Sequence, residues 1–439
     1  MAVRGNTFTY LGFDLSASGS LVCRYELDEE EFSENIDFDV PGGDFTSAAA
    51  IAAARLVYLL AGISYYKTGA AKTISVPSGL SSKERELLFH FYREGLGEFA
   101  YVNQLDLSDV EIAATKRELE KATAETVENH PLIPFGGGID SIVVVSETTR
   151  TQPNAALFVA NTSATLFEPI EQTAAITDLP ILRATRKLDE KVLRSKEHGY
   201  FNGHVPVTGI LSAIAVMTAV VSGRDSVVMS NEHSASEPTA LRANGVLVNH
   251  QWSKSLEFET LFREALFEAI SGVDYYSALR PYSEMWVAER FSKLTDYHLS
   301  FRSCNRAFFV NPERRAERWC GECDKCCFID LILSPFMSAE NLNEIFDERE
   351  PLNNPGLTDQ FHSLLGQSGQ PKPLECVGDE GECRRAALVA AERADRADNV
   401  VLASMVNYIQ SQEFVTMEFD ELLKPQGAHF LPQLFGDKS

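Results

Sequence analysis

The sequence predicts an α/β protein built on a doubly wound parallel sheet. From Leu132 onward, short apolar segments of strand length alternate with longer segments of helix length, the pattern of parallel strands joined by crossover helices. Several of the short segments end in glycine, asparagine or acidic residues, as expected where the carboxyl ends of parallel strands form a ligand crevice. The composition, 44% apolar and 23% charged, is that of an ordinary globular protein.

The chain divides into three predicted parts. Its 439 residues are enough for roughly two or three domains. We predict an N-terminal α+β domain over residues 1–115, the α/β domain over residues 130–300, and a helical C-terminal region with a cysteine knuckle over residues 301–439.

The N-terminal part combines strands and helices. A turn-forming run, 16–20, separates two strand-like runs, 8–13 and 21–25, and predicts a hairpin. The alanine-rich run from Ser47 to Leu60 is apolar on nearly all sides and predicts a buried helix. Three further predicted elements are a strand over 72–76, a helix opened by the capping-box pattern Ser81-x-x-Glu84 and running through Tyr92, and an exposed connecting helix from Asp109 to Glu128.

A Tyr65-Tyr66-Lys67 cluster follows the buried helix at a predicted helix end. Two interpretations are open, an aromatic anchor in the core and a surface that contacts a substrate. The anchor is the favoured one, because aromatic side chains bury large apolar areas.

The α/β part alternates strands and helices. Its strands are short and apolar, and its longest helix, Pro206 to Val221, is apolar throughout. The predicted strands cover 132–135, 157–161, 180–184 and 226–231, and the predicted helices between them cover 168–177, 189–197 and 206–221.

The stretch Leu132 to Thr149 organises this part. A short strand runs into three glycines, Gly136, Gly137 and Gly138, then Ile139-Asp140-Ser141 and an apolar helix that starts near Ser141. Glycines let the backbone turn sharply and present successive N–H groups to an anion, and the helix adds the positive end of its dipole. The stretch therefore predicts a phosphate-binding loop.

The spacing separates this loop from better-known glycine motifs. There is neither the GxGxxG of dinucleotide folds nor the GxxxxGK[ST] of Walker-type NTPases. The run GGGIDS resembles the SGGxDS pyrophosphate loop of the ATP pyrophosphatase superfamily, which implies an adenine-nucleotide α-hydrolase-like fold that cleaves ATP between the α and β phosphates. Gly136 departs from that pattern, since it stands where those enzymes have serine. A plain glycine turn before a buried helix is the alternative interpretation.

Other polar residues fall near predicted strand ends and helix starts. Asn161 ends the second strand and Glu232 follows the strand 226–231, so both are expected to converge with the glycines on one cleft. His204, His233 and His250 each lie in a polar run. A single histidine is more often structural than catalytic, but with three histidines in such runs a catalytic role is about as frequent as a structural one.

Four cysteines have the spacing of a metal site. Cys320, Cys323 and Cys326 recur at two-residue intervals, and Cys304 precedes them by a separate turn. Such a knuckle can wrap one ion, with the fourth thiolate completing a tetrahedron around Zn²⁺. We favour a structural zinc; an iron–sulfur cluster and unliganded thiols are the alternatives.

Charge and hydropathy limit the partners. The net charge is −24, from 63 acidic and 39 basic residues, which opposes a large nucleic-acid footprint. The run Pro206 to Val221 is too short and mixed for a membrane span, and the first residues show no signal-peptide core. We therefore expect a cytoplasmic protein without nucleic-acid or membrane partners, and the sequence leaves its oligomeric state open.

Several runs together resemble one enzyme family, the bacterial UDP-N-acetyl-α-D-muramoyl-L-alanyl-L-glutamate epimerases. The runs are Ala61 to Lys67, Gly95 to Tyr101, Asn202 to Thr208, Ser230 to Ala235 and Glu375 to Gly378. The resemblance implies an ATP- and Mg²⁺-dependent enzyme that converts the terminal L-Glu of a UDP-MurNAc-dipeptide to D-Glu and releases AMP and pyrophosphate. The cysteine knuckle also resembles that of 7-cyano-7-deazaguanine synthase.

The resemblance suggests roles for particular residues. ATP would lie on Gly136, Gly137, Gly138, Ile139, Asp140, Ser141 and Asn161, with Asp140 and Glu232 holding Mg²⁺. His204 and His250 are the expected proton-transfer pair, because imidazole titrates near neutral pH. Lys254 is expected to neutralise the adenylate or the UDP phosphates.

Two other classes of function compete with this one. The first is a different adenylating enzyme with a pyrophosphate loop, either a tRNA thiolase or an amide- or nitrile-forming ligase. The acidic net charge argues against an RNA substrate. The second is an adenine-nucleotide sensor that binds the nucleotide without chemistry.

Overall fold

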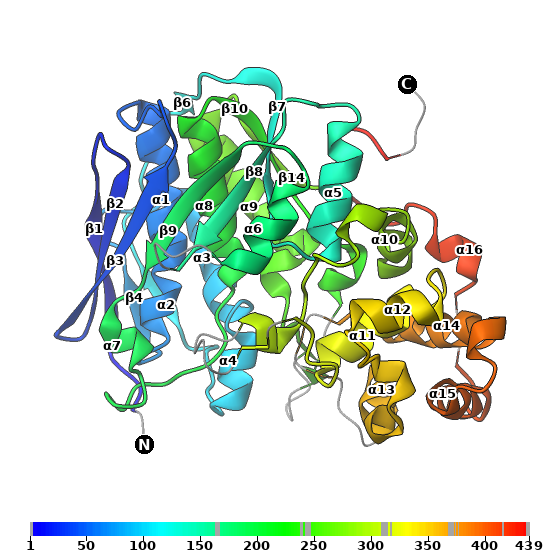
Figure 1. Ribbon diagram of the computed structural model, residues 1–439. Helices are drawn as coiled ribbons and strands as arrows, with labels where there is room; N and C mark the ends of the chain where they lie inside the picture. Colours follow the sequence, from blue (N-terminus) through cyan, green and yellow to red (C-terminus); the bar gives the residue numbers. More distant parts are fainter. Residues whose placement is uncertain are drawn as a thin grey trace.

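One large sheet runs through most of the protein (Figure 1). The structure is a computed structural model and describes residues 3–162, 167–237, 240–241, 247–308, 315–316, 318–367, 373, 375, 377–414 and 417–435. The sheet has ten strands in the order β14-β10-β7-β8-β9-β3-β2-β1-β4-β5. Their bounds are β1 (Thr7–Leu15), β2 (Ser20–Leu27), β3 (Glu30–Asp39), β4 (Thr73–Ser75), β5 (Glu111–Ala113), β7 (Val127–Pro134), β8 (Ala156–Asn161), β9 (Ile181–Lys187), β10 (Arg224–Met229) and β14 (Asp274–Ser277).

Six of the nine strand pairings in this sheet are parallel, which confirms an α/β protein with a mostly parallel sheet. β14, β10, β7, β8 and β9 form one continuous parallel block, and β9, β3, β2 and β1 pair antiparallel. Two short pairs lie outside the sheet, β6 (Ala122–Thr123) with β13 (Ile270–Ser271) and β11 (Ala240–Leu241) with β12 (Leu247–Val248).

The parallel strands divide their side chains between two hydrophobic cores. In β7, Leu132 enters one core and Ile133 the other. The same alternation places Val227 and Val228 of β10 in different cores. Because successive side chains of a strand point to opposite faces, a strand covered on both faces is apolar at every position. This explains why these segments show no polar–apolar alternation in the sequence.

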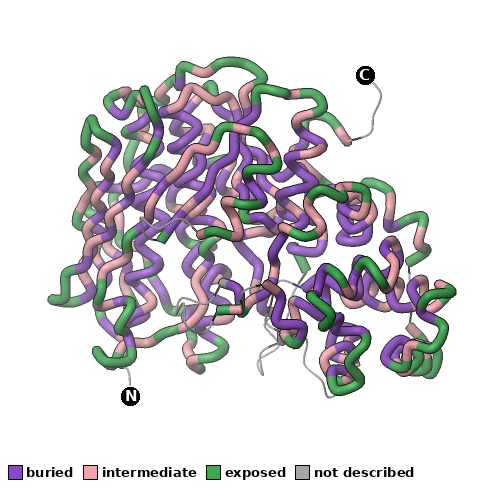
Figure 2. Tube along the Cα trace, in the orientation of Figure 1, coloured by how far each residue is buried: buried purple, intermediate pink, exposed green. Residues whose placement is uncertain are grey.

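Helices cover both faces of the sheet (Figures 1 and 2). One core is completed mainly by α1 (Ala48–Ala61), α2 (Ile63–Tyr66), α3 (Ser82–Arg93), α4 (Gly97–Val102), α7 (Glu190–Leu193), α8 (Val207–Val221) and α9 (Leu256–Ala269). The other is completed by α5 (Ile139–Thr149), α6 (Glu168–Ala175), α10 (Glu284–Phe291) and the C-terminal helices.

The predicted N-terminal elements are largely confirmed. β1 and β2 form the hairpin, and α1 begins after Ser47, whose side chain accepts a hydrogen bond from the Ala50 N–H. β4 and α3 also form as predicted, and both hydrogen bonds of the Ser81 capping box are present. Tyr65 and Tyr66 are fully buried, which confirms the aromatic-anchor interpretation for these two tyrosines.

The predicted helix from Asp109 to Glu128 is wrong. This segment instead contains β5, β6 and the start of β7. Its alanine and charged residues favour a helix. However, Ile112 pairs with Ile74 of β4, so the segment extends the sheet and its tertiary pairing overrides local propensity.

The sheet does not stop at the predicted boundary between the first two parts. β3 pairs with β9 over five residue pairs, from Asn35↔Lys187 to Asp39↔Arg183. The N-terminal strands and the parallel block are therefore one sheet. The division at residues 115–130 stays a prediction.

The C-terminal region is helical where it is described. It contains α11 (Asp324–Leu333), α12 (Ala339–Ile345), α13 (Thr358–Leu364), α14 (Glu380–Ala391), α15 (Val400–Gln410) and α16 (Phe419–Leu422). These helices gather on one side of the molecule and share a core with α5 and α10 (Figure 1).

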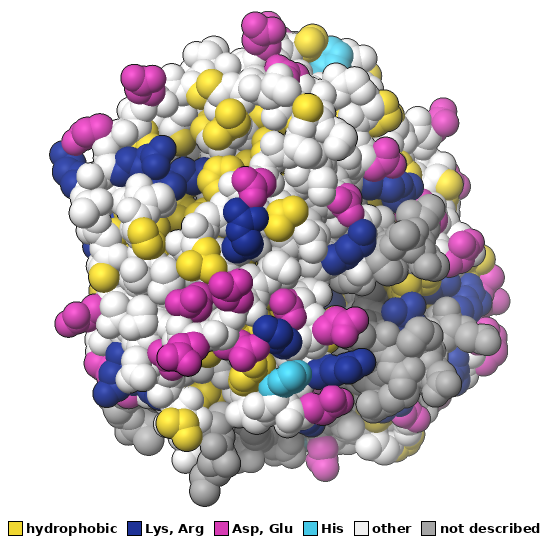
Figure 3. Space-filling view, turned by 90° about the vertical axis from the view of Figure 1, so that its left-hand side faces the viewer, with side chains coloured by type: hydrophobic (Ala, Val, Ile, Leu, Met, Phe, Trp, Pro, Cys, Tyr) yellow, Lys and Arg dark blue, Asp and Glu magenta, His cyan; other side chains and the backbone are white. Residues whose placement is uncertain are grey.

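Among the described residues, one helical stretch, Ala48–Tyr66, has the length and apolar character of a membrane span, and 83% of its apolar window is buried inside the protein. On the face in Figure 3, the described basic side chains are interspersed with acidic ones.

Candidate active site

The strand order reverses between β7 and β10, which makes this a topological switch point. From β7 the chain continues to β8 and β9 on one side, and then returns to β10 and β14 on the other. In open α/β sheets, ligands bind beyond the carboxyl ends of the strands at such a switch point. Three glycines, Gly136, Gly137 and Gly138, follow β7, and we call them the glycine loop. Glu232 follows β10.

The glycine loop has a backbone that favours glycine at Gly137. Gly137 has a φ of +73°, a left-handed conformation. A Cβ on Gly138 would lie 2.9 Å from the Ser303 Oγ, so a larger residue there would displace the Ser303 side chain. Gly136 is exposed and a Cβ there would meet nothing within 4 Å, so space alone does not explain its departure from serine.

Helix α5 begins directly after the loop. Gly138 is its N-cap, and the helix starts at Ile139, two residues before the predicted Ser141. The Ser141 hydroxyl donates to the Gly138 carbonyl at 3.0 Å, and the Arg302 N–H donates to the Gly137 carbonyl at 3.1 Å. The loop is thus fixed at the positive end of a helix of 11 residues, an arrangement suited to an anion.

Ile139 and Asn161, the other residues predicted to bind ATP, also lie near the carboxyl ends of the parallel strands. Ile139 is buried in the core beneath the loop, where its side chain supports the helix start. Asn161 is the last residue of β8, the strand beside β7, and is 8% exposed.

Three carboxylates form an acidic cluster beside the loop: Asp140, Glu232 and Glu284. Asp140 lies in the first turn of α5, and Glu284 in the first turn of α10. Burial raises the pKa of Glu284 well above its usual value, and the charges of Glu232 and Asp140 raise it further. Buried carboxylate oxygens under mutual repulsion are suitable ligands for a divalent cation such as Mg²⁺.

A buried arginine fixes the segment that carries Glu232. Arg280 is 1% exposed, donates to the Glu232 carbonyl at 2.8 Å, and also donates to the Lys254 carbonyl. Its charge is balanced by Glu259, whose Oε2 lies 3.0 Å from the Arg280 Nε. Arg280 therefore joins two segments that carry predicted site residues.

Two predicted catalytic histidines lie together. His250 Nδ1 contacts Glu98 Oε2, and His204 Nδ1 lies 3.9 Å from the same oxygen. The two imidazole rings pack with centroids 4.5 Å apart. We call Glu98, His204 and His250 the histidine cluster; their ligand atoms lie within 4.8 Å of one another, a set that can also hold a metal ion.

The environment of His204 keeps it uncharged. Burial, followed by the positive charge of His250, lowers the pKa of His204 to about 4. Glu98 opposes this shift, whereas the ammonium groups of Lys67 and Lys254 add to it. His204 is therefore a neutral proton acceptor at physiological pH.

Glu375 connects the histidine cluster to the acidic cluster. Burial raises its pKa, while a hydrogen bond with Asn305 and the charges of His250 and Lys325 lower it. Lys325 also acts on Glu284 of the acidic cluster. A Cβ on Gly378 would lie 2.9 Å from the Glu284 Cγ, so this part of the chain also approaches the acidic cluster. Cys376, next to Glu375, lies outside the described residues.

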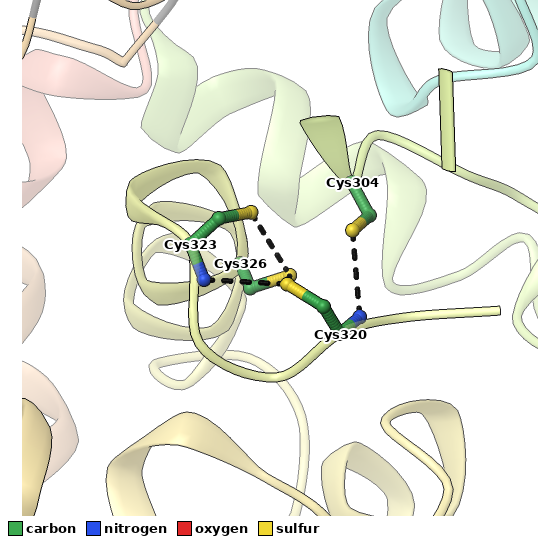
Figure 4. Close-up of side chains that lie close together, drawn as sticks. All are labelled: Cys304, Cys320, Cys323 and Cys326. Atoms are coloured by element: carbon green, nitrogen blue, oxygen red, sulfur yellow. Dashed lines mark hydrogen bonds between the residues drawn. The ribbon is translucent and has the colours of Figure 1, made fainter. Parts of the chain in front are cut away.

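The four predicted metal-ligating cysteines come together (Figure 4). Cys323 and Cys326 lie at the start of α11, Cys320 lies in the preceding loop, and Cys304 approaches from another segment. Their sulfur atoms lie within 4.8 Å of one another, with 3.4 Å between Cys323 and Cys326 and 3.7 Å between Cys320 and Cys326. A tetrahedron with Zn–S bonds of about 2.3 Å has S–S edges of about 3.8 Å, so the cluster fits one such ion.

The structure also brings in Glu98, Glu375 and Glu284, to which the sequence assigned no role. Glu98 and Glu375 belong to the runs that carry the family resemblance, so their membership in those runs was a usable signal. Glu284 had no such signal, because a lone acid after a serine is a common helix start.

Comparisons with known proteins identify the family of this chain. The family described as "MurL N-terminal domain" matches residues 2–278, and "MurL C-terminal domain" matches residues 300–419. A UDP-N-acetyl-alpha-D-muramoyl-L-alanyl-L-glutamate epimerase from Xanthomonas oryzae pv. oryzae is 34% identical over 97% of this chain and 95% of its own length. Proteins with the same name from Salinispora tropica and Micromonospora sp. are 33% and 34% identical, over 98% of this chain and 94% and 96% of their own lengths. The chain therefore belongs to the MurL family of UDP-N-acetyl-alpha-D-muramoyl-L-alanyl-L-glutamate epimerases.

Proposed function

We propose that the protein converts the terminal L-Glu of UDP-MurNAc-L-Ala-L-Glu to D-Glu in the cytoplasm, using ATP and releasing AMP and pyrophosphate. The names of its relatives supply the substrate and the isomerase reaction. The observation that carries the proposal is the glycine loop, which stands at the N-terminus of α5 and at the switch point of the sheet in a chain of this family.

The first step activates the carboxylate. The glutamate α-carboxylate oxygen attacks the α-phosphorus of ATP, the bond to the β-phosphate oxygen breaks, and pyrophosphate leaves. Gly136, Gly137, Gly138 and the start of α5, from Ile139 to Ser141, would hold the departing phosphates, and Asn161 would contact the adenosine. We assign Asp140 and Glu232 as ligands of Mg²⁺, which would be bound together with the nucleotide and would neutralise phosphate charge.

Activation makes the α-proton removable. Taking a proton from beside a free carboxylate would place two negative charges next to each other. An acyl adenylate carries no charge on the acyl group, so the electron pair released at Cα can move onto the carbonyl oxygen. Return of a proton to the opposite face, followed by hydrolysis of the acyl–phosphate bond, gives D-Glu and AMP.

The histidine cluster would act from one face of Cα. A carbon atom between two opposing bases requires roughly 6 Å between their nitrogens, since each contact takes about 3 Å. The rings of His204 and His250 pack too closely for this, with centroids 4.5 Å apart. We therefore assign both to the same face, as a relay oriented by Glu98, and assign Glu375 to the opposite face. Lys254 would neutralise the adenylate phosphate.

The histidine cluster is better suited to protons than to a metal. The ammonium groups of Lys67 and Lys254 act on His204 and would repel a cation. They favour instead an anionic substrate at this end of the site.

One assay separates this proposal from its rivals. The protein is incubated with ATP, Mg²⁺ and UDP-MurNAc-L-Ala-L-Glu, and AMP and D-Glu are quantified. AMP and D-Glu formed only with this substrate support the epimerase. AMP formed with a different carboxylate or with tRNA supports another adenylating enzyme, and no AMP with any of them supports a nucleotide sensor. We expect no dependence on nucleic acid or membranes.

Asp140 provides a test of the metal assignment. Asp140→Asn keeps the size of the side chain but removes its charge, so we expect the Mg²⁺ concentration for half-maximal AMP formation to rise by at least about tenfold. The measurement is a Mg²⁺ titration of AMP release. Asp178→Asn, a change at an exposed acid outside the glycine loop and the acidic cluster, serves as the control. An unchanged Mg²⁺ requirement would remove Asp140 from the metal site.

The cysteine cluster is proposed to hold a structural Zn²⁺. Hydrogen bonds with Cys304, Cys323 and Cys326 hold the pKa of the Cys320 thiol well below its usual value, which suits a thiolate ligand. We expect about one zinc per chain by plasma mass spectrometry, and loss of that zinc with a lower melting temperature in Cys323→Ser. Cys23→Ser, in the other core, should retain the zinc. Iron with acid-labile sulfide would identify an iron–sulfur cluster instead.

A further inference from the structure

Lys67, at the end of α2, holds a half-buried positive charge among neutral partners. Its ammonium donates to Asn202 Oδ1 at 3.0 Å and to the Gly203 carbonyl at 3.4 Å. Among the residues that the structure describes, no carboxylate oxygen lies within 4.0 Å of it. Burial, followed by the charge of Arg186, lowers its pKa. The cation is therefore held without a counter-charge from the described part of the chain.

Buried cations elsewhere in the same core are paired. Arg186 contacts Glu34 at 2.6 Å, and Arg55 contacts Glu84 at 2.6 Å. A charge taken out of water needs such a partner. At Lys67 an anionic ligand can supply the missing negative charge.

Lys67 lies at the histidine cluster. The residue that accepts its second hydrogen bond, Gly203, immediately precedes His204, and the Lys67 charge acts on the His204 ring. Asn103 also donates to the Asn202 carbonyl at 3.1 Å, which fixes the segment that Lys67 contacts. A substrate whose Cα lies at the histidine cluster therefore has a cation beside it.

We infer that the Lys67 ammonium binds the side-chain carboxylate of the glutamate residue that is epimerised. This inference rests on the proposed function. With the α-carboxylate directed to the glycine loop and the Cα at the histidine cluster, the side chain of glutamate is the substrate's remaining anion near the Cα. Lys67 would then select glutamate over residues with neutral side chains.

The test compares two ligands on two proteins. Binding of UDP-MurNAc-L-Ala-L-Glu and of the neutral analogue UDP-MurNAc-L-Ala-L-Gln is measured by calorimetry without ATP. We expect the wild-type protein to prefer the glutamate ligand by about 10²-fold, as for a charge pair in a partly desolvated site. Lys67→Met should bind the glutamate ligand about 10²-fold more weakly and the glutamine analogue almost unchanged. Lys67→Arg should keep part of the preference.

The controls separate the possible failures. Lys72→Met, at an exposed lysine nearby in sequence, should bind as the wild type does, and melting curves should show that each variant is folded. Equal losses for both ligands in Lys67→Met would assign Lys67 to the UDP diphosphate and overturn the inference. A wild-type preference that persists in Lys67→Met would also overturn it, while leaving the proposed function intact. No binding of either ligand to the wild type would overturn both.

Discussion

Replacing His250 with glutamine is expected to slow hydrogen exchange at the glutamate Cα by about 10²- to 10⁴-fold while AMP continues to form. His250 contacts the Glu98 carboxylate through Nδ1, the arrangement of an imidazole that a carboxylate orients for acid–base catalysis. Glutamine keeps a polar side chain of similar reach but lacks the imidazole that accepts and returns a proton. In the proposed mechanism adenylation depends on the glycine loop and not on His250, so the two steps should separate.

The measurement uses two readouts on one sample. The reaction is run in D₂O, deuterium at Cα is quantified by mass spectrometry, and AMP is quantified by chromatography. His130→Gln is the matched control, because His130 lies in β7 before the strand reaches the glycine loop and its imidazole bonds locally to the Glu128 carbonyl. Unaltered exchange in His250→Gln would remove His250 from proton transfer. Loss of AMP alone would reassign it to adenylation.

Arg280→Met is expected to lower the free energy of unfolding by about 3–5 kcal/mol. The variant leaves the Glu259 carboxylate buried without its cation, since the two side chains are 1% and 2% exposed. It also removes the donors to the Glu232 and Lys254 carbonyls. The Ser277 N–H would still donate to Glu259 at 2.8 Å, but a neutral donor does not balance a charge.

Urea titration of both proteins gives this value. Lys83→Met is the control, because the ion pair of Lys83 with Glu264 has side chains that are 38% and 42% exposed, and water screens such a surface pair so that it stabilises the fold little. A loss in Arg280→Met no larger than that of Lys83→Met would show that Glu259 is neutral or solvated when alone, and that Arg280 does not organise the site.

The sequence predicted the elements whose signals are local. The Ser81 capping box, the buried helix after Ser47 and the strand before the glycine loop each depend on residues close together in the chain, and each is confirmed. The segment from Asp109 to Glu128 failed because its conformation depends on a neighbour in space, β4, rather than on its own composition.

The sequence indicated the candidate site residues one at a time, but only the structure shows how these residues lie relative to one another. The separation of the two histidine rings determines whether they can serve opposite faces, and no sequence pattern encodes that distance. Glu98, Lys67 and Glu284 gain a role only through side chains that lie more than 50 residues away in the sequence, such as His250 near Glu98. Spacing was informative for the cysteines, because a knuckle is itself a local structure.

The pairing of β3 with β9 limits how the molecule can move. Five paired positions between β3 and β9 tie the first forty residues to the parallel strands, so a hinge opening between these two parts of the sheet would break a row of backbone hydrogen bonds. Substrate entry must therefore rely on smaller rearrangements at the rim, not on a swing of rigid lobes. For the same reason, a fragment cut near residue 115 would bare two complementary strand edges, and such edges promote self-association.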